Sequence, residues 1–192
     1  MRRRERPRTV HLANGMALFH GLRALLRRER TLIPKRDFSS TGDVVILLGE
    51  EIRKEVGRLY GGAALRIRTV DAGSSGAEEI ELKALTNGVY DMERFGLRFV
   101  SSPRHADMLL VTGPVTRNMV SALKETYDAI PQPCVVVAVG DGACDGGIWN
   151  ESYAVVGAVE KVIPVHAKIP GDPPSPRMIL NGLLTVLKEI RK

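Results

Sequence analysis

The apolar positions of the chain follow helical spacing in two long stretches. Asp43 is placed to cap the first helix, and Gly61 and Gly62 are expected to end it after about Tyr60. A second helix is expected over residues 176–191. The apolar stripes of these helices consist of residues three or four positions apart: Leu48, Ile52, Val56 and Leu59 in the first, and Ile179, Leu183, Leu184, Leu187 and Ile190 in the second.

Short apolar runs alternate with helical segments between these two helices. Residues 65–70 alternate apolar and polar side chains, as a strand with one covered face does. Further runs expected to be strands lie at 97–100, 108–112, 134–139 and 161–165, and helical segments are expected at 76–85, 118–129 and 150–159. Strands this apolar are typical of a parallel sheet, so the predicted fold is an α/β domain with helices on both faces of the sheet.

Four loops are expected to meet at the carboxyl edge of that sheet. They begin at Asp71, Thr112, Gly140 and Pro170, each directly after an apolar run. Folds of this class bind their ligands at the carboxyl ends of the strands. A binding site is therefore expected at this edge.

A flavin- or nucleotide-binding enzyme is one interpretation of this edge. Residues 74–76 read Ser-Ser-Gly and open a helix, and the N-terminus of a helix attracts phosphate. Glu78 and Glu79 oppose this interpretation, because they place two negative charges in the same first turn. The chain also has no P-loop motif and no complete GxGxxG motif. Flavin absorbance of the purified protein distinguishes this alternative from the others.

The positive charge of the chain is concentrated in its first 36 residues. These residues carry a net charge of +9, the remaining residues carry −3, and the whole chain carries +6. Leucines at helical spacing, with arginines on another face, predict a basic amphipathic arm over residues 1–40, followed by one domain over residues 41–192. A targeting presequence and a nucleic-acid arm are alternatives. Docking at a membrane surface is favoured, because arginines contact anionic headgroups while leucines insert shallowly, and nothing elsewhere in the sequence indicates a nucleic-acid partner.

Six motifs, in this order along the chain, resemble one protein family. They are DAGSSGAEEIE (71–81), YDMERFG (90–96), SPRHAD (102–107), LLVTGPVTRNM (109–119), GDGACDGG (140–147) and IPGDPP (169–174). Several ordered motifs are far more specific than any single one. The chain resembles the B-type subunit of NADH:quinone oxidoreductase (complex I) and, more closely, the small subunit of energy-converting, membrane-bound NiFe hydrogenases. The resemblance implies a flavodoxin-like domain that lies between a catalytic large subunit and membrane subunits.

The resemblance also implies a 4Fe-4S cluster held by four cysteines, and these cysteines are missing. The matching positions are Ser75, Glu78, Gly142 and Asp172. Oxygen atoms are poor ligands for iron–sulfur clusters, and glycine has no side chain with which to bind one. The only two cysteines, Cys134 and Cys144, are expected to be ordinary small residues. We therefore expect no cluster, no other cofactor and no metal, because three oxygen-bearing residues offer a hard cation too few ligands.

This resemblance implies a redox-silent, non-catalytic subunit of a membrane-bound oxidoreductase complex, peripheral and on the cytoplasmic side. Its expected partners are a hydrogenase- or complex I-like large subunit and the membrane subunits. An electron-transfer subunit with an unusually ligated cluster is the alternative within the same family. Glu79 matches a family glutamate beside the second cluster ligand and is a candidate for a proton path. A glutamate that the helix dipole favours in the first turn is an equally good interpretation of Glu79.

Overall fold

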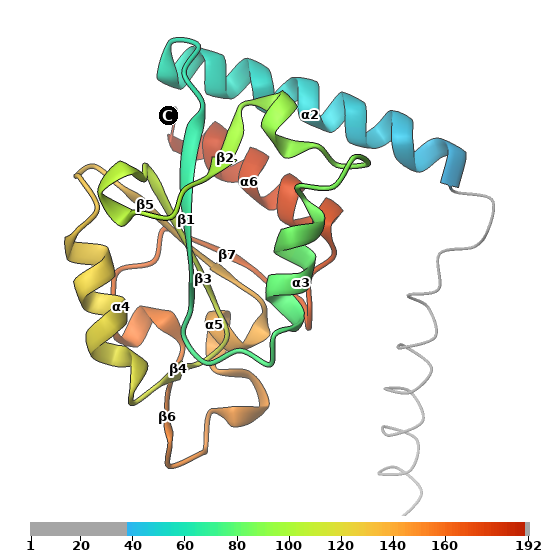
Figure 1. Cartoon of the computed structure of the whole chain (residues 1–192). Coiled ribbons are helices and arrows are strands. Elements are labelled where there is room, and N and C mark those ends of the chain that lie inside the picture. The colour runs from blue at the N-terminus through green and yellow to red at the C-terminus, as the bar shows by residue number, and fades with distance from the viewer. Residues whose placement is uncertain (1–37, 191–192) are drawn as a thin grey trace, which may run out of the picture. The chain divides into compact units, whose positions relative to one another are not determined.

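A parallel five-stranded sheet forms the centre of the protein in the computed structural model, which describes residues 38–190 (Figure 1). The strand order is β2-β1-β3-β5-β7. These strands span Leu65–Asp71 (β1), Leu97–Phe99 (β2), Met108–Thr112 (β3), Val135–Val139 (β5) and Ala167–Ile169 (β7). The order is that of flavodoxin-like folds, so the predicted fold class is confirmed.

Helices cover both faces of this sheet. The helices are α2 (Phe38–Tyr60), α3 (Ala77–Ala84), α4 (Met119–Asp128), α5 (Asp141–Asp145) and α6 (Pro176–Ile190), and single 3-10 turns occur at Met92–Phe95 (η1), Pro103–His105 (η2), Gly147–Trp149 (η3) and Val159–Lys161 (η4). Buried side chains of α2, α3 and α6 belong to one core cluster, and those of α4 and α5 belong to a second one. Every residue of the central strand β3 is buried, as a strand covered on both faces requires.

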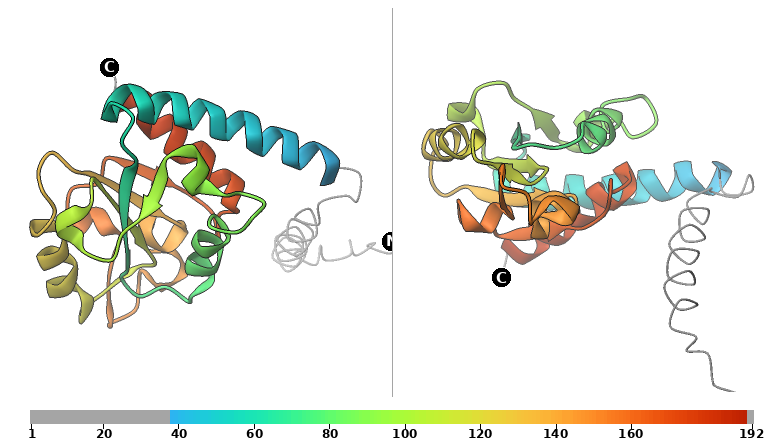
Figure 2. Two further views of the ribbon diagram at one scale, coloured as in Figure 1. Left: turned by 45° about the horizontal axis from the view of Figure 1, so that its top comes forward. Right: turned by 90° about the horizontal axis from the view of Figure 1, so that it is seen from below.

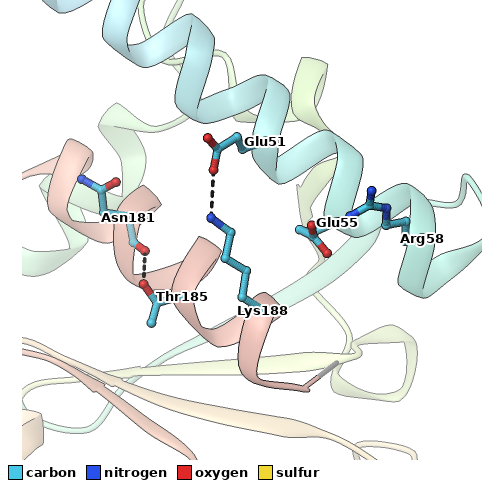
Figure 3. A network of polar contacts seen from close by, with 6 residues as sticks. All are labelled: Glu51, Glu55, Arg58, Asn181, Thr185 and Lys188. Atoms are coloured by element: carbon cyan, nitrogen blue, oxygen red, sulfur yellow. Dashed lines mark hydrogen bonds and ion pairs between the residues drawn. The ribbon is translucent and has the colours of Figure 1, made fainter. Parts of the chain in front are cut away.

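Helices α2 and α6 lie side by side on one face of the sheet (Figure 2). Their predicted apolar stripes meet in the first core cluster, where Leu48, Ile52 and Val56 of α2 and Ile179, Leu183 and Leu187 of α6 are all buried. At the rim of this contact, Lys188 Nζ donates a hydrogen bond to Glu51 Oε2 at 2.9 Å (Figure 3). Exposed ion pairs of this kind contribute little to stability, so the apolar stripes hold the two helices together.

A small second sheet lies beyond the carboxyl edge of the main one. Strand β4 (Val115–Thr116) pairs with β6 (Val155–Gly157) in antiparallel fashion. The expectation of a helix over residues 150–159 is therefore wrong. Two β-branched valines favour extended backbone, and Gly157 has a φ of 114°, which a helix does not allow.

Three further details differ from the expectations. The strand expected at 161–165 is absent and β7 follows it instead, because Pro164 lies in that run and has no N–H for a strand ladder. Helix α2 begins at Phe38, so Asp43 lies inside the helix and does not cap it. Ile190, expected in the apolar stripe of α6, is 44% exposed. The other predicted strands and helices occur where the sequence predicts them, whereas β4, α5 and the four 3-10 turns were not predicted.

The predicted basic arm over residues 1–40 lies almost entirely outside the described residues. Within residues 38–190, no helix combines the length and the apolar character that a membrane span needs. From Gly42 onward the chain forms one compact unit, and this unit contains all four expected loops.

Candidate functional site

The loop after β1 turns sharply at the carboxyl edge of the sheet and leads into α3. Asp71 fixes the turn, because its Oδ1 atom accepts hydrogen bonds from the backbone N–H groups of Gly73 (2.8 Å) and Ser74 (2.7 Å). Gly76 precedes the helix with a φ of 88°, a conformation that glycine adopts without strain. The turn places Glu78 and Glu79 together in the first turn of α3.

The side chain of Glu78 points into the protein and lies against the loop that follows β5. Glu78 is only 5% exposed, and its Oε2 atom has no hydrogen-bond partner among the described residues. A Cβ added at Gly140 would lie 2.8 Å from Glu78 Oε1, so the carboxyl group occupies the space that a side chain at position 140 would need. The second position of the expected ligand set is therefore filled by a buried carboxyl group.

This environment favours the protonated form of Glu78. Burial raises the pKa of Glu78, because a charged carboxylate is poorly solvated inside a protein. A backbone hydrogen bond opposes this effect, whereas the negative charges of Glu79, Asp172 and Asp71 raise the pKa further. Burial of an oxygen atom without a hydrogen-bond partner also costs less free energy when the carboxyl group is neutral than when it is charged.

The neighbouring Glu79 has a different environment, because both of its carboxylate oxygens accept hydrogen bonds. Ser74 Oγ donates to Oε2, and Thr112 Oγ1 donates to Oε1. Thr112 is the last residue of β3 and is buried. Glu79 thus joins the loop after β1 to the end of the central strand.

The other three positions of the expected ligand set, Ser75, Gly142 and Asp172, have different environments. A Cβ at Gly142 would lie 2.7 Å from Pro114 Cδ and 3.0 Å from Pro114 N, so the loop after β3 already fills the space beside α5. Ser75 and Asp172 are exposed, and the link between Asp172 and Glu78 is the negative charge of Asp172, which raises the pKa of Glu78. Across residues 38–190, no three side chains of Asp, Glu, His or Cys come together as a metal site.

The loops after β5 and β7 are held together by Asp141 and Gly171. The Asp141 carboxylate accepts a hydrogen bond from the Gly171 N–H at 2.7 Å, and the Asp141 N–H donates one to the Gly171 carbonyl at 2.8 Å. Sequence reasoning did not single out Asp141 for this role. Only its place directly after an apolar run, at the edge where the loops meet, distinguishes it in the sequence.

Both cysteines are buried and belong to the second core cluster. Burial, assisted by the negative charge of Asp141, raises the pKa of Cys144 to about 11. Burial also raises the pKa of Cys134. Thiols in this state are poor metal ligands, because metals bind the thiolate form. The two residues therefore pack in the core; the sequence predicts this for Cys134, whereas Cys144 was expected to be a small residue of the loop.

Residues 76–186 match the family model described as the 20 kDa subunit of NADH ubiquinone oxidoreductase. The chain belongs to this family. The matched residues make up more than half of the sequence and contain Glu78, Gly142 and Asp172, three of the four positions that the resemblance assigns to cluster ligands. The resemblance to B-type subunits, inferred from six motifs, is thereby confirmed.

Individual relatives of this 20 kDa subunit family include proteins of membrane-bound complexes. An uncharacterised protein of Methanocaldococcus jannaschii is 45% identical over 128 residues, which are 67% of this chain and 86% of the relative. A probable membrane-bound hydrogenase subunit of Pyrococcus furiosus is 41% identical over 123 residues, which are 64% of this chain and 74% of the relative. Among solved structures, a chain of the membrane-bound sulfane sulfur reductase, an archaeal respiratory membrane complex, superimposes with a TM-score of 0.61 at 31% identity and covers 71% of this chain and 76% of that one.

Proposed function

We propose that this protein is a redox-silent, non-catalytic subunit of a membrane-bound respiratory complex related to complex I and to energy-converting hydrogenases. In this role it carries no 4Fe-4S cluster and joins a large subunit to the membrane part of the complex. Two observations support its assignment to a complex of this kind: its family membership and the membrane complexes that the names of its relatives give. The absence of a redox role rests on the side chains at the carboxyl edge of the sheet.

The buried carboxyl group of Glu78 is the observation that carries the proposal. It stands at a cluster-ligand position, occupies the space beside Gly140, and has a raised pKa caused first by burial. Beside it, the ring of Pro114 leaves Gly142 no room for a side chain. Glu78 offers an oxygen ligand that tends to be neutral, and Gly142 offers no ligand at all. These two positions are therefore poorly suited to binding an iron–sulfur cluster. Packing and hydrogen bonds thus replace the cluster at this edge.

The segment after α5 supports a partner subunit at the same edge. Ile148 (86% exposed), Trp149 (55%) and Tyr153 (88%) are large apolar side chains on the surface. Their segment begins next to Gly142, because a Cβ at Gly147 would lie 3.3 Å from the Gly142 Cα. Exposed apolar side chains grouped in one segment are typical of protein–protein contacts, in which Trp and Tyr often contribute most of the binding energy. We assign this surface to the large subunit.

The hydrogen bonds of Glu79 support a positioning role for this residue more than a proton path. Both of its oxygens are occupied by the hydroxyl groups of Ser74 and Thr112. Such a carboxyl group holds the loop after β1 against the end of β3. By the same proposal the protein is peripheral, lies on the cytoplasmic side and reaches the membrane through its basic arm, whose residues 1–37 lie outside the described part of the chain. Iron and acid-labile sulfide analysis of the anaerobically purified protein tests the central statement.

A further inference from the structure

A cavity of about 730 Å³ opens near the beginning of β1, at the opposite end of that strand from the loop that contains Ser75. It is lined by residues of β1 and β2, by the segment between β2 and β3, and by the end of α2. Small-molecule sites in proteins have volumes of roughly 300–1,000 Å³. The cavity plays no part in the function proposed above.

Two arginines stand side by side in this cavity. Arg66 of β1 and Arg98 of β2 are direct partners in the parallel β1–β2 ladder, and both line the cavity. Directly paired residues of neighbouring strands project from the same face of the sheet, and like charges at such positions repel one another. A negative charge close to the two arginines would reduce this repulsion.

Asp107 supplies negative charge to only one of the two arginines. Its carboxylate accepts hydrogen bonds from Arg66 Nε (3.0 Å), from the Arg66 NH2 nitrogen (2.8 Å) and from the Arg66 backbone N–H (3.0 Å). Burial acts to raise the pKa of Asp107, but the hydrogen bonds and the charge of Arg66 outweigh it and lower the pKa. Among residues 42–190, no acidic side chain forms an ion pair with Arg98.

Hydrogen-bond donors and apolar groups complete the lining. Tyr60, Ser101, Ser102 and His105 also line the cavity. Burial, followed by the charge of Asp107, raises the pKa of Tyr60, so its hydroxyl group keeps its proton and remains a donor. Phe99 and Val100 add apolar surface beside these donors.

We infer that this cavity binds a phosphate group attached to an apolar body, with Arg98 as its main charged contact. The planar guanidinium group binds phosphate oxygens through paired hydrogen bonds, and the nearby hydroxyl and imidazole groups match the additional oxygens that phosphate offers. Phe99 and Val100 provide a surface for the apolar part. A soluble phosphate ester and the headgroup of a phospholipid share this chemistry, and experiment separates the two sources.

The test uses the full chain, labelled with ¹⁵N and titrated with phenyl phosphate and with inorganic phosphate. We expect saturable shifts of the Ser101 and Ser102 amide signals, with phenyl phosphate binding more tightly than inorganic phosphate. Arg98→Ala should weaken binding about tenfold, as expected for the loss of a charged hydrogen-bonding partner. Arg104→Ala is the matched control, because it removes the same charge from a residue that is close in sequence but does not line the cavity. The amide spectra also show whether each variant is folded.

Flotation with vesicles of phosphatidylcholine and phosphatidylglycerol in equal parts identifies the source of the phosphate. If Arg98→Ala reduces flotation and Arg104→Ala does not, the ligand is a phospholipid headgroup. If only the titration with phenyl phosphate depends on Arg98, the ligand is a soluble phosphate ester. If Arg98→Ala behaves like Arg104→Ala in both experiments, the protein attracts anions by general charge alone and the inference is overturned.

Discussion

The carboxyl group of Glu78 lies where a side chain at Gly140 would otherwise be, since a Cβ at Gly140 would be 2.8 Å from Glu78 Oε1. The two residues come from loops that follow different strands, β1 and β5. Their contact buries an acid at a position where the family resemblance implies a cluster-binding cysteine.

Ionisation of Glu78 should make the protein less stable as pH rises. The pKa of Glu78 is raised above its ordinary value of 4.5, chiefly by burial, so the folded state keeps a proton that the unfolded state has lost. Stability is therefore greatest below the unfolded pKa and falls as pH rises through the folded pKa. Urea unfolding at a series of pH values that begins below 4.5 should show this decline. The decline should be smaller in Glu78→Gln, and the exposed control Glu93→Gln should behave like the parent. An identical pH profile in parent and Glu78→Gln would contradict the assignment.

A side chain at Gly142 should destabilise the protein. Gly142→Ala places a Cβ 2.7 Å from Pro114 Cδ, and the expected loss is about 1–3 kcal/mol in the free energy of unfolding. Gly57→Ala is the matched control, because a Cβ at this helical glycine meets nothing within 4 Å and should stabilise the protein by about 0.5–1 kcal/mol. Equal effects of the two changes in urea unfolding would show that the space beside Pro114 is not filled.

The clash at Gly142 also limits what the introduction of four cysteines can achieve. If the arrangement of the loops were the only requirement, cysteines at positions 75, 78, 142 and 172 would create the family's ligand set. The Gly142→Cys change instead introduces the clash with Pro114, so we expect cluster uptake only where the loop after β3 moves to make room.

Removal of the Thr112 hydroxyl group should weaken the connection between β3 and the loop after β1. Thr112→Val keeps the shape of the side chain but leaves Glu79 Oε1 without this hydrogen bond, at an expected cost of about 1–3 kcal/mol. Thr185→Val is the control, because the Thr185 hydroxyl group only bonds the Asn181 carbonyl on the exposed side of α6 (Figure 3). A loss no larger than that of the control in chemical denaturation would remove the positioning role given to Glu79.

The apolar segment after α5 should be required for assembly with the large subunit. Trp149→Ala combined with Tyr153→Ala should abolish co-purification with the tagged large subunit. The free energy of unfolding should change by no more than about 0.5 kcal/mol, because both side chains are on the surface. Val89→Ala, at another exposed apolar residue, should leave assembly intact. Unchanged co-purification of the double variant would assign the surface to some other role.

The sequence predicted the sheet and its main helices because their apolar periodicity is long and clear. The stripes of α2 and α6 and the continuous apolar run of β3 have few alternative interpretations. Short elements were harder to predict, since β6 has only three residues and its pairing with β4 depends on a residue about forty positions away. The run at 161–165 has the apolar character of a strand, but Pro164 has no N–H group for a strand ladder.

The edge of the sheet at which the candidate residues lie was predictable, but their contacts were not. Motif order placed Ser75, Glu78, Gly142 and Asp172 at the same edge of the sheet, and the structure brings Glu78 within range of the charge of Asp172. The contact of Glu78 with Gly140 and the filling of the space at Gly142 by Pro114 depend on distances between separate loops. The spacing of residues within one segment of sequence does not reveal distances between separate loops. The same is true of the bond between Asp141 and Gly171.

Iron and acid-labile sulfide analysis tests the central claim most directly. The protein is purified anaerobically from cells with ample iron and is then treated under standard cluster-reconstitution conditions, with a cysteine-ligated relative of the same family as the positive control. The account predicts that the relative gains iron, sulfide and brown absorbance, while this protein gains none of them. Stoichiometric iron and sulfide in this protein, in either preparation, would contradict the redox-silent role.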